Sequence, residues 1–361
     1  MKIFAYYLPQ FHCIPENDEW WGKGFTEWTN VKKAKPLFKG HNQPTIPLNN
    51  NYYDLSKVET LKWQEQLMKK FNVDGLIFYH YYFKGKKLLE KPAEMLLDNK
   101  ELNINFFFCW ANHTWYRSWQ GKKDILVEQK YGDSKDWEKH FNYLLPFFKD
   151  KRYEKKDNKP ILLLFNSGFR EKENMISYFN KRCLENGFNG ICIIETINDY
   201  NFKKTQKKLY IKNRLYHFRE PTSAWYSYTR NYLHIHIRAR NLIIKKLANK
   251  GCRVLIKYSG DKFYKLMIKQ ANKEEKNIIR GLFFEWDNTP RHGYRGYIIT
   301  PPKKELFMKY MNRIRNDEYV FVNAWNEWCE GMMMEPTTKD GYKYLEWIKE
   351  WKDNENRTDG L

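Results

Sequence analysis

A tryptophan-rich segment near the end of the chain places two glutamates, Glu327 and Glu330, three residues apart. It follows the apolar run 319–324 and reads Trp325-Asn326-Glu327-Trp328-Cys329-Glu330-Gly331. Two carboxyl groups beside a glycosidic bond can serve as proton donor and as base or nucleophile. Tryptophan side chains offer flat apolar faces on which a sugar ring can stack. The segment therefore predicts a catalytic pair, Glu327 and Glu330, acting at the anomeric carbon of a sugar.

The neighbours of the two glutamates predict how they act. A carboxyl group enclosed by Trp325 and Trp328 would lose solvation, which raises its pKa and suits a proton donor at neutral pH. We expect Asn326 to orient a carboxylate or to bind a ring hydroxyl. Glu335 is a weaker candidate that could brace the loop. Because the spacing does not show that the two carboxyl groups meet, an ordinary ion pair with a lysine stays open as the alternative.

Two other clusters mix aromatic and polar residues. The first reads Trp20-Trp21-Gly22-Lys23-Gly24-Phe25-Thr26-Glu27-Trp28. It is typical of a substrate-binding lid, with Trp21, Glu27 and Trp28 as candidate sugar contacts, although an apolar plug that caps a barrel is the alternative. The second cluster supplies four candidates: Trp110, Asn112, His113 and Arg117. Arg117 could bind a phosphate or carboxylate with two hydrogen bonds, or form an ordinary ion pair.

The remaining candidate substrate contacts are polar or aromatic residues near the ends of apolar runs: Tyr6, His12, His80, His217, Trp286 and Asp287. We expect no metal, because the histidines lack a ligand spacing such as HExxH. We also expect no cofactor, because no GxGxxG or P-loop motif is present. The chain contains no Gly-x-Ser-x-Gly elbow, so a serine hydrolase is not indicated.

Eight apolar runs rich in β-branched and aromatic residues alternate with amphipathic stretches. Continuous apolar character suits strands that are covered on both faces, as in parallel sheets. The pattern predicts an α/β fold, a (β/α)8 TIM-like barrel, with a doubly wound sheet as the alternative. The expected strands are 3–8, 75–83, 104–111, 161–165, 190–197, 215–218, 281–286 and 319–325, and a ninth run, 253–258, could replace 215–218. The expected helices include 55–71, 136–148, 173–186 and 303–314.

Polar and aromatic residues gather at the same end of nearly every expected strand. His12 follows the first run, Asn112 and His113 follow the third, and the two glutamates follow the eighth. Active sites of TIM barrels lie at the carboxyl ends of the strands. The pattern therefore supports both the barrel and a polar cleft of the size of a sugar. Without a linker or a repeat, we expect residues 1–361 to form a single domain with elaborated strand-end loops.

The net charge of +21 is unevenly distributed along the 361 residues. Residues 201–260 contain 15 Lys and Arg against one acidic residue, Glu220. This basic section could be a solvated surface, a contact for anionic membrane lipid or a diphosphate substrate, or a nucleic-acid footprint. We expect no nucleic-acid partner, because carboxylates clustered at the strand ends would repel phosphate.

The six cysteines show no paired spacing, which indicates reduced thiols in a cytosol. The first ten residues resemble a core strand rather than a signal peptide. No stretch approaches 18 apolar residues, the length of a membrane span. We therefore expect a cytoplasmic protein, with peripheral contact to the inner face of the membrane through 201–260 as an open extension.

The chain resembles the WbsX-like glycosyltransferase family of bacterial surface-polysaccharide gene clusters, whose members contain a glycoside hydrolase family 99-like domain. The similarity covers most of the chain. Its motifs are Tyr6-Tyr7-Leu8-Pro9-Gln10-Phe11-His12, the stretch 17–31, Trp110-Ala111-Asn112, Trp286-Asp287-Asn288-Thr289 and Asn323-Ala324-Trp325-Asn326-Glu327-Trp328. The resemblance implies a (β/α)8 barrel and a substrate that is an oligosaccharide or a lipid-linked glycan.

Family 99 enzymes are retaining endo-acting mannosidases and mannanases, and their Asn-Glu-Trp-x-Glu-Gly segment aligns with 326–331. The resemblance implies that Glu327 is the base that helps the 2-hydroxyl of the substrate attack C1, which gives a 1,2-anhydro sugar. It implies that Glu330 is the acid that protonates the leaving oxygen. His113 and Gln120 stand where relatives have acidic residues, which bears on sugar specificity, and 199–260 is the most divergent section.

These observations predict a carbohydrate-active enzyme that forms or remodels glycosidic bonds in bacterial surface-polysaccharide (O-antigen or capsule) biosynthesis. One alternative is a retaining, mannosidase-like endo-glycosidase that acts through a 1,2-anhydro sugar. Hydrolysis and transfer share their first step, so the sequence does not separate them. A second alternative is a non-catalytic glycan-binding protein.

Overall fold

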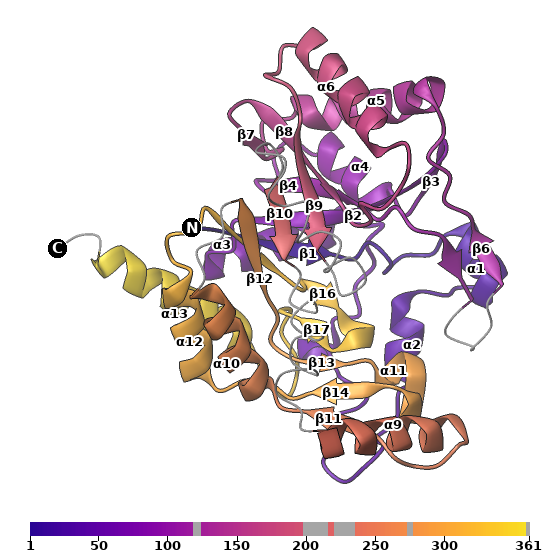
Figure 1. Ribbon diagram of the computed structural model, residues 1–361, viewed down its shortest axis with the longest axis vertical. Coiled ribbons are helices and arrows are strands. Elements are labelled where there is room, and N and C mark those ends of the chain that lie inside the picture. The colour runs from indigo at the N-terminus through magenta and orange to yellow at the C-terminus, as the bar shows by residue number, and fades with distance from the viewer. Residues whose placement is uncertain (118–123, 198–215, 220–234, 273–276, 359–361) are drawn as a thin grey trace.

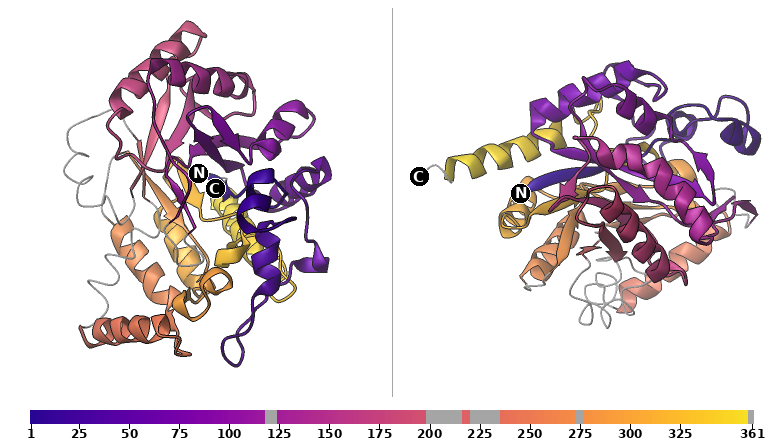
Figure 2. Two further views of the ribbon diagram at one scale, coloured as in Figure 1. Left: turned by 90° about the vertical axis from the view of Figure 1, so that its right-hand side faces the viewer. Right: turned by 90° about the horizontal axis from the view of Figure 1, so that it is seen from above.

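The computed structural model describes residues 1–117, 124–197, 216–219, 235–272 and 277–358. Within these ranges eight parallel strands close into a barrel, because β1 pairs with both β2 and β15. The ring runs through β1 (Lys2–Tyr7), β2 (Gly75–Phe83), β4 (Asn105–Trp110), β8 (Lys159–Leu164), β9 (Cys192–Ile197), β10 (Tyr216–Arg219), β12 (Ile278–Leu282) and β15 (Tyr319–Val322). Figures 1 and 2 show the strands surrounded by helices. The predicted (β/α)8 barrel is confirmed, and the doubly wound alternative is wrong.

The barrel settles which apolar run supplies the sixth strand. The run 215–218 supplies β10, which lies between β9 and β12. The run 253–258 instead supplies β11 (Ile256–Tyr258) of a small sheet with β14 (Tyr297–Ile299) and β13 (Trp286–Asp287). The seventh strand begins three residues earlier than the expected 281, and Trp286 belongs to β13. That expected strand combined the end of β12 with the loop after it, which is equally apolar.

Helices of the outer layer follow the strands. The predicted helices 55–71, 136–148, 173–186 and 303–314 are confirmed, each within a few residues. The outer helices are α3 (Val58–Phe71), α4 (Lys91–Asp98), α5 (Ser134–Lys149), α6 (Lys172–Glu185), α10 (Gly260–Ala271), α12 (Lys304–Arg313) and α13 (Lys343–Thr358). The strand-end loops carry α1 (Pro15–Trp21), α2 (Glu27–Lys33), α9 (Ile235–Asn249) and α11 (Thr289–His292). Among the described helices, none is both long and apolar enough to cross a bilayer.

Aromatic rings fill the inside of the barrel. Phe107 of β4 contacts Phe4 of β1 with ring centroids 5.2 Å apart, and Phe321 of β15 at 5.5 Å. Phe321 also contacts Phe218 of β10 at 5.0 Å. Rings from strands on different sides of the barrel meet only at its centre. A Cβ on Gly75 of β2 would lie 2.1 Å from the Phe4 ring, so this position must be glycine for the ring to fit. Part of the high aromatic content of the chain, 18% of its residues, therefore packs the core.

Two asparagine side chains join neighbouring strand ends. Asn326, which follows β15, accepts a hydrogen bond from the Leu8 backbone N–H at 2.7 Å and donates to the Leu8 carbonyl at 3.1 Å. Asn112, which follows β4, makes the same pair of bonds to the backbone of Asn166 after β8, both at 2.7 Å. An amide side chain has one donor and one acceptor, so it can replace a missing rung of a parallel sheet. Both asparagines are fully buried, and they extend the barrel beyond its regular strands.

Replacing Asn326 with Ala should destabilise the fold. The buried N–H and carbonyl of Leu8 would lose their partner, and each unsatisfied buried group costs about 1–3 kcal/mol. We expect the free energy of unfolding in urea to fall by about 3 kcal/mol. Asn142 of α5 is exposed, so the control Asn142→Ala should change it by less than about 0.5 kcal/mol. Equal effects of the two substitutions would contradict the bridging role.

Candidate active site

A cavity of about 490 Å³ opens at the carboxyl ends of the barrel strands. Its walls include residues at or after β1 (Leu8, Gln10), β2 (Tyr79, Tyr81), β4 (Ala111, His113), β8 (Phe165), β12 (Trp286) and β15 (Asn323). This volume lies within the range of small-molecule sites. The strands therefore converge on one hollow at the end of the barrel where TIM-barrel active sites lie.

Glu327 and Glu330 both line this cavity. Glu327 ends β16 (Asn326–Glu327), which pairs with β17 (Met332–Met333), and Glu330 ends the 3₁₀ turn η4 (Trp328–Glu330). A 3₁₀ turn has three residues per turn, so side chains three positions apart lie on the same side. Gly331 closes the turn at φ 61°, and a Cβ there would lie 2.9 Å from the Asp287 nitrogen. The local turn thus brings together two carboxyl groups whose spacing alone left their geometry open.

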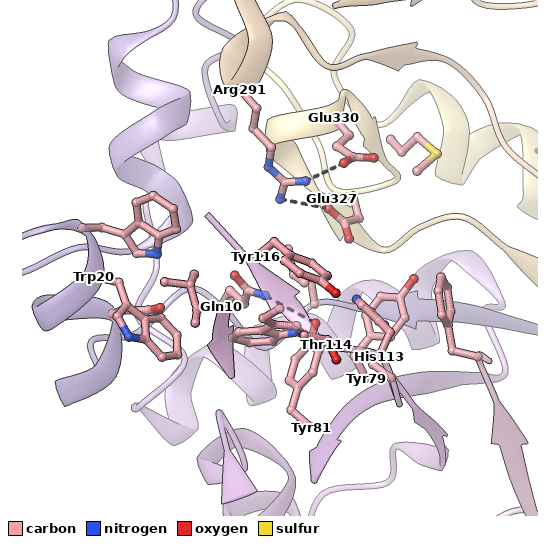
Figure 3. Close-up of a pocket in the computed structure, with 18 of the residues that line it drawn as sticks. Gln10, Trp20, Tyr79, Tyr81, His113, Thr114, Tyr116, Arg291, Glu327 and Glu330 are labelled. Carbon is pink, nitrogen blue, oxygen red and sulfur yellow. Dashed lines mark hydrogen bonds and ion pairs between the residues drawn. The ribbon is translucent and has the colours of Figure 1, made fainter. Parts of the chain in front are cut away.

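Arg291 of α11 binds three carboxylates at once. Its Nη1 lies 2.5 Å from Glu330 Oε1, and its Nη2 lies 3.1 Å from Glu27 Oε2 and 3.7 Å from Glu327 Oε2. Figure 3 shows the guanidinium extending from α11 toward the two glutamates of the cavity. Sequence reasoning missed Arg291. The available signal was its position two residues beyond the quoted motif 286–289, in a loop that follows a strand.

The carboxylate of Glu27 belongs to this cluster rather than to the cavity wall. Glu27 begins α2, is fully buried and forms its ion pair with Arg291. The sequence suggested a sugar contact, but the structure encloses this side chain behind the arginine. Since a buried charge needs a compensating charge, Glu27 and Arg291 stabilise each other away from solvent.

The cluster distributes proton and charge unequally between the two cavity glutamates. Burial, together with the nearby Glu330 and Glu27 charges, raises the pKa of Glu327 to about 8, although Arg291 opposes the shift. Glu330 has the shorter contact with Arg291, the geometry of an ionised carboxylate with a guanidinium. Burial alone would lower the pKa of Arg291, but the three carboxylates raise it well above its ordinary value. The raised pKa favours the protonated form of Glu327 near neutral pH, while Glu330 makes the shorter contact with the Arg291 guanidinium.

Asp287 positions the helix that carries Arg291. Its Oδ1 accepts hydrogen bonds from the Thr289 N–H at 3.0 Å and the Thr289 hydroxyl at 2.6 Å. Its Oδ2 accepts from Gln43 at 2.8 Å and lies 2.8 Å from His41 Nε2. All of these contacts are to protein groups, and Asp287 does not line the cavity. The predicted sugar contact is thus a support for the start of α11.

Alternation along β2 separates cavity residues from packing residues. Tyr79 and Tyr81 point into the cavity, whereas His80 points the opposite way, because successive strand side chains lie on opposite faces. His80 Nε2 lies 2.9 Å from His140 Nε2 of α5, and burial lowers the pKa of His80 to about 3. The predicted sugar contact at His80 is therefore a packing residue. Tyr79 and Tyr81 were not among the predicted contacts, although the alternation of strand side chains places them on the face opposite His80.

The wall opposite the glutamates is aromatic. Trp20 and Trp115 line it and meet edge to face at 6.0 Å, and Trp21 lies beside them. Arg117 donates from Nη1 to the Trp20 carbonyl at 2.7 Å and its guanidinium lies 5.3 Å from the Trp21 ring. Arg117 therefore positions this wall and does not itself line the cavity. Trp21, His113 and Trp286 are the predicted contacts that do line the cavity together with the glutamates.

The other predicted contacts are buried and do not line the cavity. Trp28 and Trp110 donate their indole N–H to the backbone carbonyls of Tyr53 and Tyr82. The residues in this group are Tyr6, His12, Trp28, Trp110, Asn112, Trp325, Asn326 and Trp328. Large aromatic and amide groups at strand ends can pack between the loops as readily as they can face a ligand. The side chain of His217 and the whole of Gln120 lie outside the described residues.

Glu335 anchors the floor beneath the site. Its Oε2 accepts from the Tyr53 hydroxyl and the Trp328 indole N–H, and its Oε1 accepts from Gln64, each at 2.7 Å. Burial raises the pKa of Glu335 to about 7, although these hydrogen bonds oppose the rise. This network holds η4 from below through Trp328. The bracing role suggested for Glu335 agrees with these contacts.

The chain belongs to the family described as glycosyltransferase WbsX, whose model matches residues 3–348. It is similar to the WxcX proteins of two strains of Xanthomonas campestris pv. campestris, each 30% identical over 359 residues. The matched region is 95% of this chain and 48% of each relative, so the chain spans about half the length of the curated relatives it matches.

The fold resembles that of solved glycoside hydrolase structures. One is the GH99 endo-alpha-mannosidase from Bacteroides thetaiotaomicron, with a TM-score of 0.57 and 12% identity over 99% of this chain and 98% of that one. Another is described as a glycoside hydrolase-like protein, with a TM-score of 0.59 and 12% identity over 97% and 93% of the two chains. At this identity the likeness establishes the fold alone. The resemblance to the WbsX family and to a GH99-like fold is confirmed.

The proton on Glu327 should make stability depend on pH. The folded-state pKa of about 8 lies above the ordinary value of 4.5, so the folded protein retains a proton that the unfolded chain releases between these pH values. The resulting stability is complete below about pH 4.5 and is lost as the pH rises toward 8, with a slope of up to about 1.4 kcal/mol per pH unit. Urea unfolding between these pH values should show a flatter profile for Glu327→Gln than for wild type.

The control for this comparison is Glu346→Gln, a substitution of an exposed glutamate on α13. It should keep the wild-type slope. A Glu327→Gln profile parallel to that of wild type would show that Glu327 is already ionised in the folded protein at neutral pH.

Removing Arg291 should damage both stability and chemistry. Arg291→Gln leaves Glu27, Glu327 and Glu330 without their shared cation, and an uncompensated buried charge costs about 3–5 kcal/mol. Arg291→Lys keeps a charge but cannot contact several carboxylates in a fixed plane, so it should retain more stability while activity stays low. Thermal and urea unfolding would measure this order, with Arg313→Gln on the exposed face of α12 as control. Equal stability of wild type and Arg291→Gln would contradict the role of Arg291 as counter-ion.

Proposed function

We propose that this protein is a carbohydrate-active enzyme that forms or remodels glycosidic bonds with Glu327 and Glu330 as its catalytic pair. One observation carries the proposal: the two carboxyl groups line one cavity together with aromatic rings at the carboxyl ends of the strands, and both contact Arg291. A reaction at an anomeric carbon needs one carboxylic acid and one carboxylate. The aromatic side chains of the cavity walls suit stacking on a sugar ring, and the cavity volume suits a sugar together with part of the adjoining sugar units.

The proton must change position before the reaction that the family resemblance implies. In that reaction Glu327 takes the proton of the substrate 2-hydroxyl while O2 attacks C1, and Glu330 gives a proton to the leaving oxygen as the C1–O bond breaks. The raised pKa of Glu327 favours the opposite starting arrangement, with the proton on Glu327. Because Arg291 contacts both, the pair can exchange proton and counter-ion without changing its total charge. We propose that substrate binding moves the proton to Glu330 and gives Glu327 the closer contact with Arg291.

The second half of the reaction restores the site. An acceptor hydroxyl loses its proton to Glu330 and attacks C1, and the C1–O2 bond of the 1,2-anhydro sugar opens. O2 then takes back the proton that Glu327 holds. Water as acceptor gives hydrolysis and a sugar hydroxyl gives transfer, so the same residues support both. The open mouth of the cavity leaves room for either acceptor.

We propose transfer in bacterial surface-polysaccharide assembly as the biological reaction. Membership in a family described as glycosyltransferase supports transfer, and the basic section 201–260 supports an acceptor linked to lipid phosphate at the inner face of the membrane. We further propose that the protein acts in the cytoplasm and that residues 1–361 act as one domain. The second candidate is endo-glycosidase activity, which the GH99-like fold favours.

The decisive experiment measures turnover by mass spectrometry on lipid-extracted polysaccharide intermediates and on mannan-type oligosaccharides. Wild type is compared with Glu327→Gln, Glu330→Gln and the surface control Glu346→Gln. Chain lengthening that both site variants lose and the control keeps would support a transferase. Since each glutamine removes an acid or base, we expect a loss of about 100-fold or more.

Other outcomes separate the alternatives. Shortening of oligosaccharides that depends on both glutamates would establish a glycosidase and overturn the transfer proposal. Oligosaccharide binding without any change of mass, equal in wild type and in Glu327→Gln, would indicate a non-catalytic glycan-binding protein.

A further inference from the structure

A second cavity, which we call the basic groove, lies between α9 and the segment that follows β13. It has a volume of about 470 Å³. Figure 1 shows α9 beside β11 and β14, with α11 close by. Its lining from α9 includes Arg238, Asn241 and Lys245, and its lining from the other side includes His292 and Arg295. The groove is distinct from the cavity that contains the two glutamates, because no described residue lines both.

The electrostatics of the basic groove favour an anion. Arg238, Lys245 and Arg295 line it, and none of the described residues of its lining is Asp or Glu. In the part of the chain that the structure describes, none of these three cations forms an ion pair with a carboxylate. Three cations that gather without a carboxylate repel one another, and a bound phosphate would relieve this repulsion. Buried Asn241 and the Tyr258 ring add a polar and an apolar surface to the same wall.

The basic groove and the glutamate cavity are separated by α11. Arg291 lines the glutamate cavity, and the next residue, His292, lines the basic groove. Burial lowers the pKa of His292, and the charges of Arg291 and Arg295 lower it further. A molecule that reaches across α11 could therefore place a charged group in the groove and a sugar at the glutamates.

The outer face of α9 carries an exposed apolar stripe. Its members lie 7, 8 and 12 positions after the first, spacings that place them on one face of a helix. They are Ile235, Leu242, Ile243 and Leu247, with exposed fractions of 82%, 63%, 57% and 38%. The helix also contains Arg238, Arg240, Lys245 and Lys246 and no acidic residue. An apolar face flanked by basic residues is typical of helices that lie in the interface of an anionic bilayer.

We propose that the basic groove binds the phosphate or diphosphate ester of a lipid-linked glycan while the apolar stripe of α9 rests on the bilayer. The glycan part of this inference depends on the proposed function, but the phosphate site does not. Leu242 belongs to both the stripe and the groove lining, so the lipid chain and the phosphate meet at one edge. The ester would hold the sugar end of the substrate near α11 and the glutamates.

The test measures binding of inorganic pyrophosphate and of phosphatidylcholine vesicles that carry a polyprenyl diphosphate. The groove variant is Arg238→Gln/Lys245→Gln. The matched control is Arg240→Gln/Lys246→Gln, which removes the same two residue types from the same helix but from positions outside the groove lining. We expect the groove variant to weaken pyrophosphate binding about tenfold and the control to change it little. Equal weakening by both variants, or no pyrophosphate binding by wild type, would overturn the proposal.

A second comparison distinguishes a lipid-linked ester from a soluble one. The stripe variant Ile243→Ser/Leu247→Ser changes two stripe residues outside the groove lining, so it should lose binding to the polyprenyl diphosphate vesicles and keep pyrophosphate binding. Wild-type binding to pyrophosphate together with no preference for these vesicles over vesicles of phosphatidylglycerol would overturn the lipid-linked part. All binding measurements are repeated with the Glu330→Gln variant. Because Glu330 does not line the basic groove, this variant should bind pyrophosphate as wild type does, whether or not the catalytic proposal holds.

Discussion

The arrangement at the mouth of the barrel depends on one guanidinium, that of Arg291, which contacts three carboxyl groups. Glu27 lies 300 positions or more before Glu327 and Glu330, and without Arg291 between them these carboxyl groups would repel one another in a poorly solvated space. The cluster therefore requires α2, α11 and η4 to meet at one point. Asp287 holds α11 in place, and Glu335 holds η4 from below through Trp328. Two further acidic residues thus support the two that face the cavity.

The same ion cluster gives the two cavity glutamates different environments, and this difference bears on which of them acts as acid and which as base. Arg291 makes its shorter contact with Glu330, while burial and the neighbouring carboxyl groups raise the pKa of Glu327. A pair that shares one proton is ready for acid and base work in either direction. The residue that sets this asymmetry carries no acid or base function itself, which is why motif reasoning passed over it.

The barrel contributes a rigid framework, and the alternation of side chains along its strands decides which residues face the cavity. Aromatic rings fill its interior, and asparagine side chains extend its hydrogen bonding past the last regular rung. Side-chain alternation then sorts residues at each strand end into cavity and packing sets, as Tyr79 and His80 show. A similar fold occurs in proteins of 12% identity, so the framework tolerates extensive change. What the protein does depends on the loops at the carboxyl ends.

The sequence by itself determined the barrel, because a continuous apolar run encodes a strand covered on both faces wherever it lies in the chain. Each of the eight runs became a barrel strand, with the seventh displaced where the following loop is equally apolar. It also indicated the two glutamates, since their types and setting are local properties. The roles of Glu27, Arg291 and Asn326 were decided by tertiary structure alone, because each depends on partners that are distant in sequence. Burial and charge pairing are properties of the folded neighbourhood, and no local pattern specifies which of many buried polar residues will face the substrate and which will face one another.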